Sequence, residues 1–279
     1  RTRVPWYGVP AIFDLTDHHA LVTGSSKGVG RAIAYSLAQA GADVVIHARE
    51  LNDEAKSSIK RCKAHDVDAQ FVAGDLAQSS EAVVDEVFAA ALEANPDIDI
   101  LINNAGAFFD VPFLEMTFDG FEKTIRLNVE AGYFLTQRFA KYWIERRVAG
   151  RVVFVGSING ELGEEHSTAY DISKGAIRMM VRTLTIALAR HNIRVNGLAP
   201  GLVRSHATLW LDDKPEREKW LAAHTPNGLV PDSAVCGPGA VYLVSDEAEH
   251  VHGHMLMIDG GMGAWQHPDP PADASDVGL

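Results

Sequence analysis

The chain has 279 residues, 47% of them hydrophobic and 22% charged, which are ordinary values for a globular protein large enough to bury a sizeable core. The formal net charge of −12 disfavours nucleic acid and anionic membranes as main partners, because both attract basic patches. No apolar run reaches the length of a membrane span, and the first residues do not resemble a signal peptide. With only Cys62 and Cys236, a disulfide framework is not expected, and a reducing cytoplasm fits better.

Strand-like and helix-like segments alternate from residue 19 to residue 261. Apolar, β-branched runs predict strands at 19–24, 43–48, 69–75, 97–106, 150–157, 193–201 and 253–261. Helical patterns lie between them, including 31–41, which stops at Gly41, and 79–94, which a serine opens. This alternation predicts a doubly wound parallel α/β sheet with helices on both faces.

No internal repeat or change in composition marks a linker within this region. We therefore expect one domain over 19–261, an N-terminal extension at 1–18 and a C-terminal tail at 262–279. The tail is rich in proline and aspartate, which is typical of a flexible end unless a neighbouring subunit holds it.

A glycine-containing turn, TGSSKGVG at 23–30, joins the first predicted strand to the first predicted helix. A tight turn at such a junction presents backbone N–H groups and the positive end of a helix to a phosphate. Gly24, Gly28 and Gly30 give the spacing Gly-x-x-x-Gly-x-Gly, which differs from the commonest dinucleotide fingerprint and alone fits a plain connecting turn equally well. Its position at the first strand–helix junction favours nucleotide binding.

The end of the second predicted strand, IHARE, bears on which nucleotide binds. Ala48 stands where an acid would bind a ribose 2′-hydroxyl, and Arg49 follows it. With Lys27 in the glycine turn, two cations favour a 2′-phosphate, hence NADP(H). Glu50 is the rival residue that keeps NAD(H) open, and the alternative for both cations is that they are solvated loop charges.

Taken together, the motifs resemble those of the classical short-chain dehydrogenase/reductase family, from about Asp14 to Gly261. The resemblance rests on TGSSKGVG (23–30), Asp75, NNAG (103–106), LNV (127–129), Ser157, YDISK (170–174) and PG (200–201), in that order. It implies a single Rossmann-type domain with a seven-stranded parallel sheet, assembled as a homodimer or homotetramer. It also implies hydride exchange between a nicotinamide cofactor and a small carbonyl or alcohol substrate.

The resemblance assigns site residues position by position. It implies a catalytic set of Asn128, Ser157, Tyr170 and Lys174. The residues expected to bind the cofactor are Gly24, Ser26, Lys27, Gly28, Val29, Gly30, Arg49, Asp75, Leu76, Asn104, Ala105, Gly106, Tyr170, Lys174, Pro200, Gly201, Val203 and Ser205. Asp75 would bond the adenine, and Leu76 would lie alongside it. Ser205 stands where the family usually has a threonine, and Thr208 is a less fitting substitute.

The chemistry expected of this set centres on Tyr170 and Lys174, which are i, i+4 neighbours on one predicted helix. A phenol pKa near 10 must fall to roughly 7 for proton exchange at neutral pH, and the ammonium and the oxidised nicotinamide would both lower it. Tyr170 would be the general acid in reduction and the base in oxidation. Ser157 would donate to the substrate oxygen, and by resemblance Asn128 would position a water beside Lys174. Each residue alone fits an ordinary aromatic, cap or turn role.

Two further segments bear on the substrate. Residues 158–170 include Glu161, Glu164, Glu165 and His166, which suit a hydroxyl-bearing substrate such as a sugar, a polyol or a small keto compound, although a wet surface loop is the alternative. The region around 202–226 is expected to form a substrate lid. Its residues Trp210 and Trp220 would either close over the site or anchor the lid.

The histidines His250, His252 and His254 alternate as on a strand face, but no acid or cysteine completes a metal set, so no metal is expected. The sequence thus predicts an NADP(H)-preferring oxidoreductase acting on a carbonyl/alcohol pair. A 3-oxoacyl-[acyl-carrier-protein] reductase is an alternative, against which the acidic balance counts slightly. A non-catalytic dinucleotide sensor or assembly subunit is a second alternative, which the intact catalytic set disfavours.

Overall fold

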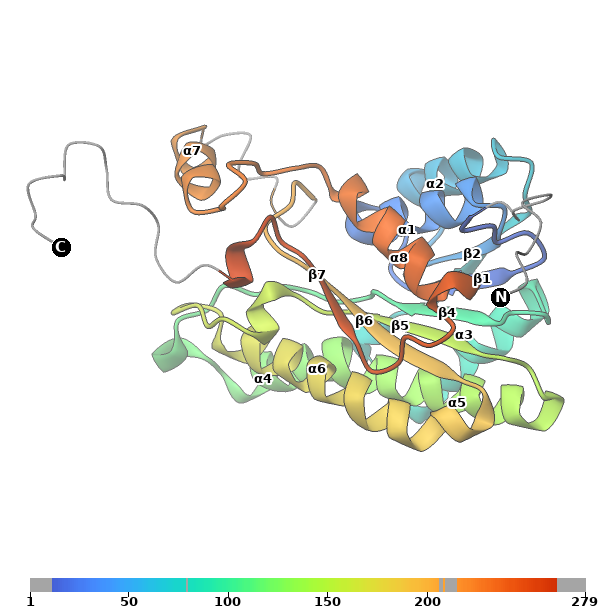
Figure 1. Cartoon of the computed structure of the whole chain (residues 1–279). Helices are drawn as coiled ribbons and strands as arrows, with labels where there is room; N and C mark the ends of the chain where they lie inside the picture. The colour runs from blue at the N-terminus through green and yellow to red at the C-terminus, as the bar shows by residue number, and fades with distance from the viewer. Residues whose placement is uncertain (1–11, 79, 206–207, 209–214, 265–279) are drawn as a thin grey trace, which may run out of the picture.

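The computed structural model describes residues 12–78, 80–205, 208 and 215–264, to which every structural statement below refers. A seven-stranded sheet lies between two layers of helices (Figure 1). The strands are β1 (His19–Val22), β2 (Asp43–Ala48), β3 (Ala69–Ala73), β4 (Ile100–Asn103), β5 (Arg151–Val155), β6 (Arg194–Pro200) and β7 (Met255–Ile258). Their order is β3-β2-β1-β4-β5-β6-β7, and each neighbouring pair is parallel. The predicted doubly wound sheet is confirmed.

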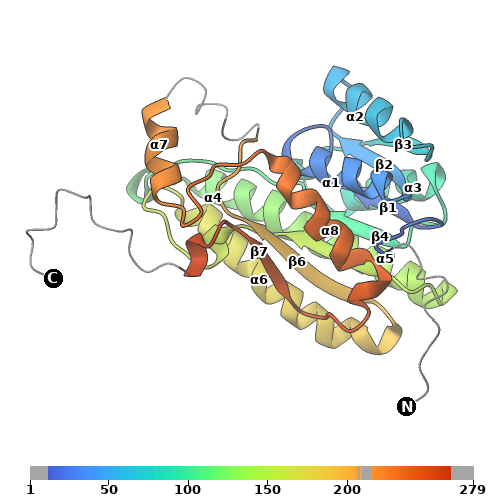
Figure 2. The same ribbon diagram turned by 45° about the horizontal axis from the view of Figure 1, so that its top comes forward.

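Helices cover both faces of the sheet. They are α1 (Gly28–Gln39), α2 (Asp53–Lys63), α3 (Glu81–Ala94), α4 (Phe118–Ile125), α5 (Ala131–Arg146), α6 (Thr168–Leu188), α7 (Pro215–Ala223) and α8 (Cys236–Val244). One face carries α1, α2 and α8, and the other carries α3, α5 and α6 (Figure 1). The short helix α7 stands apart from both layers, near the end of the sheet where the strands finish (Figure 2). Among these helices none is long and apolar enough to cross a membrane.

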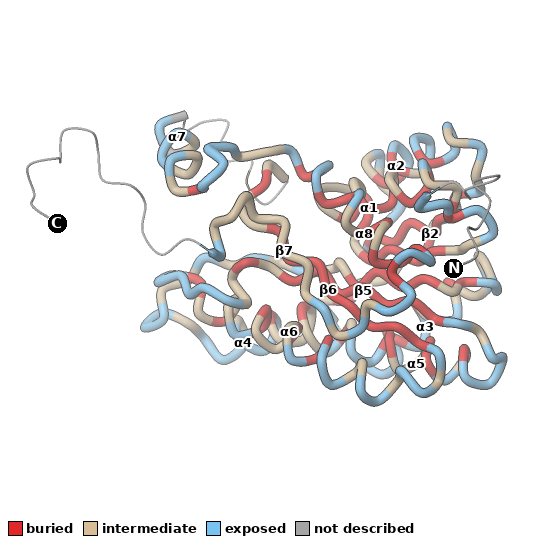
Figure 3. The backbone as a smooth tube through the Cα atoms, viewed as in Figure 1, coloured by how far each residue is buried: buried red, intermediate tan, exposed pale blue. Residues whose placement is uncertain are grey.

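The core consists of two apolar layers, one on each side of the sheet, and the buried segments follow the strands and inner helix faces (Figure 3). All residues of β4 and β5 are buried, which explains why these strands appear in the sequence as continuous apolar runs rather than alternating ones. The two helix ends expected from the sequence are also present. Gly41 has φ +100° one residue beyond the α1 C-cap, and the Ser80 side chain accepts the N–H of Val83 at the start of α3.

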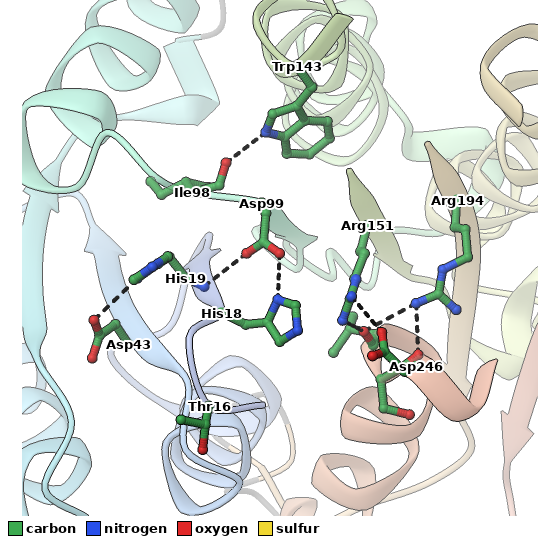
Figure 4. Close-up of polar contacts among 12 residues, drawn as sticks. Thr16, His18, His19, Asp43, Ile98, Asp99, Trp143, Arg151, Arg194 and Asp246 are labelled. Atoms are coloured by element: carbon green, nitrogen blue, oxygen red, sulfur yellow. Dashed lines mark hydrogen bonds and ion pairs between the residues drawn. The ribbon is translucent and has the colours of Figure 1, made fainter. Parts of the chain in front are cut away.

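The amino-terminal edge of the sheet is held by polar contacts among its own residues (Figure 4). The Asp99 carboxylate lies 2.6 Å from Nδ1 of His18 and accepts the His19 N–H at 2.9 Å. Arg151 pairs with Asp246 at 2.7 Å. These groups satisfy one another across strand and helix ends, so this edge is structural. In parallel sheets ligands bind at the opposite, carboxyl edge, where the candidate residues gather.

One expectation about the sheet was wrong. His250, His252 and His254 were placed on a strand face, but β7 begins only at Met255, so all three lie in the preceding loop. The described residues contain no group of three or more side chains that could hold a metal ion. Of the predicted lid, Trp210 lies outside the described residues, as do residues 1–11 of the expected extension and 265–279 of the tail.

Candidate active site

Two adjoining cavities open at the carboxyl edge of the sheet, with volumes of about 740 and 610 Å³. They share Val29, Asn104 and Gly106, so they form one continuous cleft. The first, here called the substrate cavity, is lined by Ser157, Tyr170 and Lys174 and by residues after β6. The second, here called the nucleotide cavity, lies over the glycine turn and the ends of β2 and β3. Cavities of this size suit a dinucleotide and a small substrate.

The structure brings every predicted cofactor residue to this cleft. The nucleotide cavity is lined by Gly24, Ser26, Lys27, Gly28, Val29, Gly30, Arg49, Asp75, Leu76, Asn104, Ala105, Gly106 and Ser205. The substrate cavity is lined by Tyr170, Lys174, Pro200, Gly201, Val203 and Ser205, together with Ser157. Of the predicted catalytic and cofactor residues, Asn128 alone lines neither, because it lies behind them and is buried. Glu161, expected beside the substrate, also lines neither cavity and pairs with Arg178 instead.

The glycine turn has the geometry of an anion-binding loop. Gly24 has φ +63°, a conformation that favours glycine, and a Cβ on Gly30 would lie 2.4 Å from the Asn104 side chain and 2.5 Å from the Gly24 carbonyl oxygen. The N-cap residue of α1, Lys27, makes no side-chain capping bond, so the first-turn N–H groups of α1 stay uncapped by side chains. The turn therefore presents backbone donors where a phosphate would sit.

The ends of β1 and β4 are tied together beside this turn. The Thr23 hydroxyl accepts the N–H groups of Asn104 and Ala105, each at 3.0 Å. The Asn104 amide nitrogen in turn donates to the carbonyls of Thr23 at 2.9 Å and Gly24 at 3.1 Å. Asn104 thus holds the glycine turn against the chain leaving β4, and this explains why position 30 has no room for a side chain.

His47, a residue that sequence reasoning missed, supports the same turn from β2. Its Nδ1 accepts the Gly24 N–H at 3.1 Å, and its side chain lines the nucleotide cavity although it is almost fully buried. Burial lowers the pKa of His47 to about 4, so the ring is neutral at neutral pH and Nδ1 keeps its lone pair for Gly24. The sequence shows only a histidine inside an apolar strand, which fits a core residue equally well.

The corner expected to bind the cofactor's ribose contains charges of both signs. Lys27, Arg49, Glu50 and Glu54 all line the nucleotide cavity. The Lys27 Nζ atom lies 3.7 Å from a Glu54 carboxylate oxygen, so part of its charge is neutralised by a helix residue 27 positions away. Asp75 uses its two carboxylate oxygens for the Ala77 N–H and the Gln78 side chain, at 3.1 Å each.

Tyr170 and Lys174 lie on α6 and face the substrate cavity together with Ser157, which follows β5. The Lys174 Nζ atom is 5.4 Å from the centre of the Tyr170 ring and donates to the Val155 carbonyl at 2.9 Å. Ser157 hydrogen-bonds the Tyr170 phenol. The i, i+4 pair predicted from the sequence is therefore assembled with its serine partner at the mouth of the cleft.

The pKa of Tyr170 is raised in the structure, whereas the sequence led to the expectation that Lys174 and the cofactor would lower it. Burial raises the pKa of Tyr170 to about 12, the Ser157 hydrogen bond opposes this rise, and the Glu164 and Asp171 carboxylates add to it. Burial also lowers the pKa of Lys174 to about 8. The phenol therefore holds its proton more tightly than a free tyrosine does, chiefly because of desolvation.

Asn128 and Asn159 position the catalytic groups from behind. The Asn128 side chain accepts the Ala107 N–H at 2.9 Å and donates to the Ala107 carbonyl and the Ser173 hydroxyl at 3.0 Å each. It lies in a π-helical turn, Arg126–Glu130, a feature that often marks functional sites. The Asn159 N–H donates to the Ser157 hydroxyl at 3.1 Å.

The Asn159 amide nitrogen also donates to Asp171 at 2.9 Å, which links the serine loop to α6. Asn159 was not predicted, although it lies only two residues from Ser157, because a loop asparagine carries no distinguishing signal. Beyond β6, Ser205 and Thr208 both line the substrate cavity. The Thr208 hydroxyl accepts the Ser205 N–H at 2.7 Å and donates to the Val203 carbonyl at 2.9 Å. Thr208 thereby shapes the loop that carries Ser205.

Comparisons with known proteins agree with this geometry. The model of the short chain dehydrogenase family matches residues 18–215. The chain is 33% identical over 251 residues to the 5-keto-D-gluconate 5-reductase of Escherichia coli, covering 90% of this chain and 97% of that protein. It is 35% identical to the L-rhamnose 1-dehydrogenase (NAD(P)(+)) of Sphingomonas sp., covering 87% of this chain and 94% of that protein.

A solved structure is similar over the same extent. The gluconate 5-dehydrogenase of Burkholderia cenocepacia, crystallised with NADP and tartrate, superposes with a TM-score of 0.84 at 30% identity. The match covers 91% of this chain and 98% of that one.

Proposed function

Because the chain belongs to the short-chain dehydrogenase family, we propose that it is an NADP(H)-preferring oxidoreductase in which Tyr170, Lys174 and Ser157 interconvert a carbonyl and a secondary alcohol on a sugar-like substrate. The observation that carries the proposal is the shared cleft, in which the Tyr170 phenol faces a substrate cavity that continues into the cavity over the glycine turn. A bound nicotinamide dinucleotide would supply or accept the hydride at the substrate carbon.

The residues around the glycine turn fit that dinucleotide. The conformation of Gly24, the absence of room at Gly30 and the uncapped start of α1 together form a cradle for a pyrophosphate. The neutral ring of His47 holds the turn in this shape. Arg49 and Lys27 would pair with a ribose 2′-phosphate, and Glu54, which touches Lys27, limits the strength of that preference.

In the direction of carbonyl reduction, the Tyr170 hydroxyl gives its proton to the substrate oxygen and becomes a phenolate. Ser157 donates a hydrogen bond to the same oxygen and stabilises the negative charge that develops on it. The Lys174 ammonium stabilises the phenolate, because an adjacent cation favours the charged form of the ring. In alcohol oxidation the phenolate accepts the proton, and the roles reverse.

Lys174 and the cofactor's positive charge must together offset the burial that holds the Tyr170 pKa high. The Lys174 Nζ atom has one described protein partner, the Val155 carbonyl, which orients it toward the ring. Its remaining donors would reach the nicotinamide ribose hydroxyls. Asn128 fixes the neighbouring Ala107 backbone and Ser173, so we assign it a positioning role rather than contact with the substrate.

The substrate assignment rests on relatives named for sugars and sugar acids and on the lining of the substrate cavity. Asn159 and Glu164 offer acceptors for hydroxyl groups, while Phe108 and Trp220 offer apolar faces. A 3-oxoacyl-[acyl-carrier-protein] reductase fits less well, because acidic residues at the mouth would repel an acidic carrier. A silent sensor fits less well, because it needs no aligned Tyr170, Lys174 and Ser157.

We further propose that the chain acts as a homodimer or homotetramer in the cytoplasm. Exposed apolar side chains gather on the outer helices: Phe113, Leu114 and Phe118 lie at and before the start of α4, and Met179 and Ile186 lie on α6. Such a surface is typical of an interface between subunits. Light scattering during gel filtration would measure the assembly, and a monomer at micromolar concentration would contradict it.

The activity is tested by a panel of aldoses, polyols and ketoses with NADP⁺ or NADPH, followed at 340 nm. We expect turnover by the wild type and a loss of roughly 100-fold or more in Ser157→Ala, because Ser157 stabilises charge only in the transition state. Thr183→Ala, on the exposed side of α6, serves as the matched control and should keep full activity. Equal rates for Ser157→Ala and wild type would contradict the assignment.

A further inference from the structure

We propose that the substrate site selects an uncharged sugar or polyol and discriminates against sugar acids, an inference that rests on the proposed function. Three carboxylates, those of Asp110, Glu164 and Glu165, line the substrate cavity. The relatives named above include enzymes for both classes, a keto-gluconate and a neutral sugar, so similarity alone does not choose between them.

The three acids come from two loops that are joined at the cavity. Asp110 follows β4, and Glu164 and Glu165 lie between β5 and α6. The N–H of Val111, next to Asp110, donates to the carbonyl of His166, next to Glu165, at 2.9 Å. This backbone bond brings the two acidic segments side by side, so their charges act on the same region of the cavity.

The second loop is also held in place by side chains. The Glu164 N–H donates to Asp171 on α6 at 2.7 Å, and the Glu164 carboxylate accepts the Ser167 hydroxyl at 3.1 Å. The same Asp171 carboxylate receives the Asn159 amide that supports Ser157. The acidic segment is thus connected to the catalytic serine through a chain of three hydrogen bonds.

Nearby carboxylates also affect the reacting phenol of Tyr170. Burial is the main reason for the raised pKa of Tyr170, and Glu164 and Asp171 raise it further. Carboxylates that act on the phenol also act on a substrate whose oxygen meets that phenol. A negative charge on the substrate would therefore be repelled by the exposed carboxylates of Asp110, Glu164 and Glu165.

The described lining offers little to compensate such a charge. Lys174 is the one lysine or arginine among the described lining residues, and its Nζ atom is oriented by Val155 for catalysis. Two arginines close in sequence to lining residues form ion pairs with other residues. Arg178 pairs with Glu161, and Arg204 pairs with Glu218. Sites that recognise a carboxylate usually supply an arginine fork, which this lining does not present.

A neutral sugar finds complementary groups in the same place. Ionised carboxylates are strong acceptors for hydroxyl donors. Trp220 and Phe108 both line the cavity and are 59% and 40% exposed, so their rings are accessible to the C–H side of a sugar ring. The cavity therefore combines acceptors with apolar faces, and its described lining holds no arginine that could bind a carboxylate with two parallel hydrogen bonds.

The test compares matched neutral and acidic substrates. D-glucose and L-rhamnose are assayed against D-gluconate with NADP⁺, and a neutral ketose is assayed against 5-keto-D-gluconate with NADPH. We expect kcat/KM for the neutral member to exceed that for the acid by about tenfold or more, because several like charges repel the acid. Raising the salt concentration should narrow this gap by screening.

Charge-removing variants separate repulsion from shape. Glu165→Gln and Asp110→Asn should each raise kcat/KM for the acid by roughly threefold to tenfold, since one like charge is removed at nearly constant volume. Neither variant should raise kcat/KM for the neutral substrate, because an amide is a weaker acceptor for hydroxyl groups than a carboxylate. Glu86→Gln, an exposed acid on α3 in the opposite part of the fold, is the matched control and should change neither value.

The outcomes distinguish failure of this inference from failure of the proposed function on which it rests. A preference for the acid that the two variants leave unchanged would overturn the charge selection and leave the oxidoreductase assignment intact. Absence of turnover with any sugar, polyol or sugar acid, by a protein that binds NADPH, would instead overturn the sugar assignment and this inference with it.

Discussion

The Lys174 ammonium lies 5.4 Å from the centre of the Tyr170 ring and is tethered to the Val155 carbonyl at 2.9 Å. The tether comes from the end of β5, two residues before Ser157, so one strand end orients both the amine and the serine. Burial pushes the two pKa values apart, to about 12 for Tyr170 and about 8 for Lys174. Proton transfer in this pair therefore depends on what else enters the cleft.

Carbonyl reduction should lose rate as the pH rises through about 8. The pKa of Lys174 is lowered to about 8, so the ammonium that stabilises the Tyr170 phenolate is present below that pH and lost above it. Lys174→Arg should be slower but should lack this loss, because a guanidinium stays charged. The measurement is kcat/KM for reduction between pH 6 and pH 10. Identical profiles for the two proteins would contradict this role.

Arg49→Ala should weaken NADPH binding far more than NADH binding, by about tenfold or more, because one charge-assisted contact with a 2′-phosphate is removed. Glu54→Gln should strengthen NADPH binding, since it frees Lys27 from its 3.7 Å ion pair. Fluorescence titration of both cofactors checks both effects. If Arg49→Ala changes the two dissociation constants equally, the cofactor preference has another origin.

His47→Asn should reduce the dependence of stability on pH between about 6.5 and 4. The unfolded histidine takes up a proton below 6.5, whereas the folded one does so only near 4, so folding loses stability as the pH falls through this window. The wild type should lose up to about 3 kcal/mol more than the variant, which follows from the size of the shift.

Urea unfolding at pH 7 and pH 4.5 measures this difference, with His252→Asn in an exposed loop as the control. His47→Leu, which has no acceptor, should weaken NADPH binding at pH 7, because the Gly24 N–H loses its Nδ1 partner. A variant with the pH dependence of the wild type would show that folding does not lower the pKa of His47.

Cys62 and Cys236 should be inert toward thiol reagents in the native protein at pH 8. Both are buried, and burial raises the pKa of Cys62 to about 11 and that of Cys236 to about 12, so neither thiolate is populated. Titration with a chromogenic disulfide should find both thiols only after denaturation. Rapid reaction of either thiol without denaturant would contradict the packing around it.

Much of the fold follows from sequence because its determinants are local. The apolar runs that become β1 to β7 and the turns at Gly41 and Ser80 depend on neighbouring residues only. The predicted strands nevertheless ran past the sheet, as at 97–106, where β4 ends at Asn103. Beyond Asn103, the Thr23 hydroxyl accepts the next two N–H groups, those of Asn104 and Ala105. These contacts join residues about 80 positions apart in the sequence.

The same limit applies at the site. The spacing of Tyr170 and Lys174 could be predicted from the sequence. The direction of the Tyr170 pKa shift could not, because it depends on burial and on carboxylates that the fold brings near. His47 supports Gly24 across two strands, and Glu54 partly neutralises Lys27 from a helix. Such partners become visible only when the chain is folded.

The most direct test of the central claim is the rate of NADPH-dependent carbonyl reduction by Tyr170→Phe, measured with the best substrate of the wild type. The substitution removes the proton donor and leaves the ring, including its edge-to-face contact with Phe108 at 5.0 Å. We predict that kcat falls by roughly a thousandfold, as expected for loss of a general acid, while the NADPH dissociation constant stays within about threefold of the wild type, a change under 1 kcal/mol. A variant that binds NADPH normally and retains more than about a tenth of the wild-type kcat, a barrier change of less than 1.4 kcal/mol, would contradict the role of Tyr170.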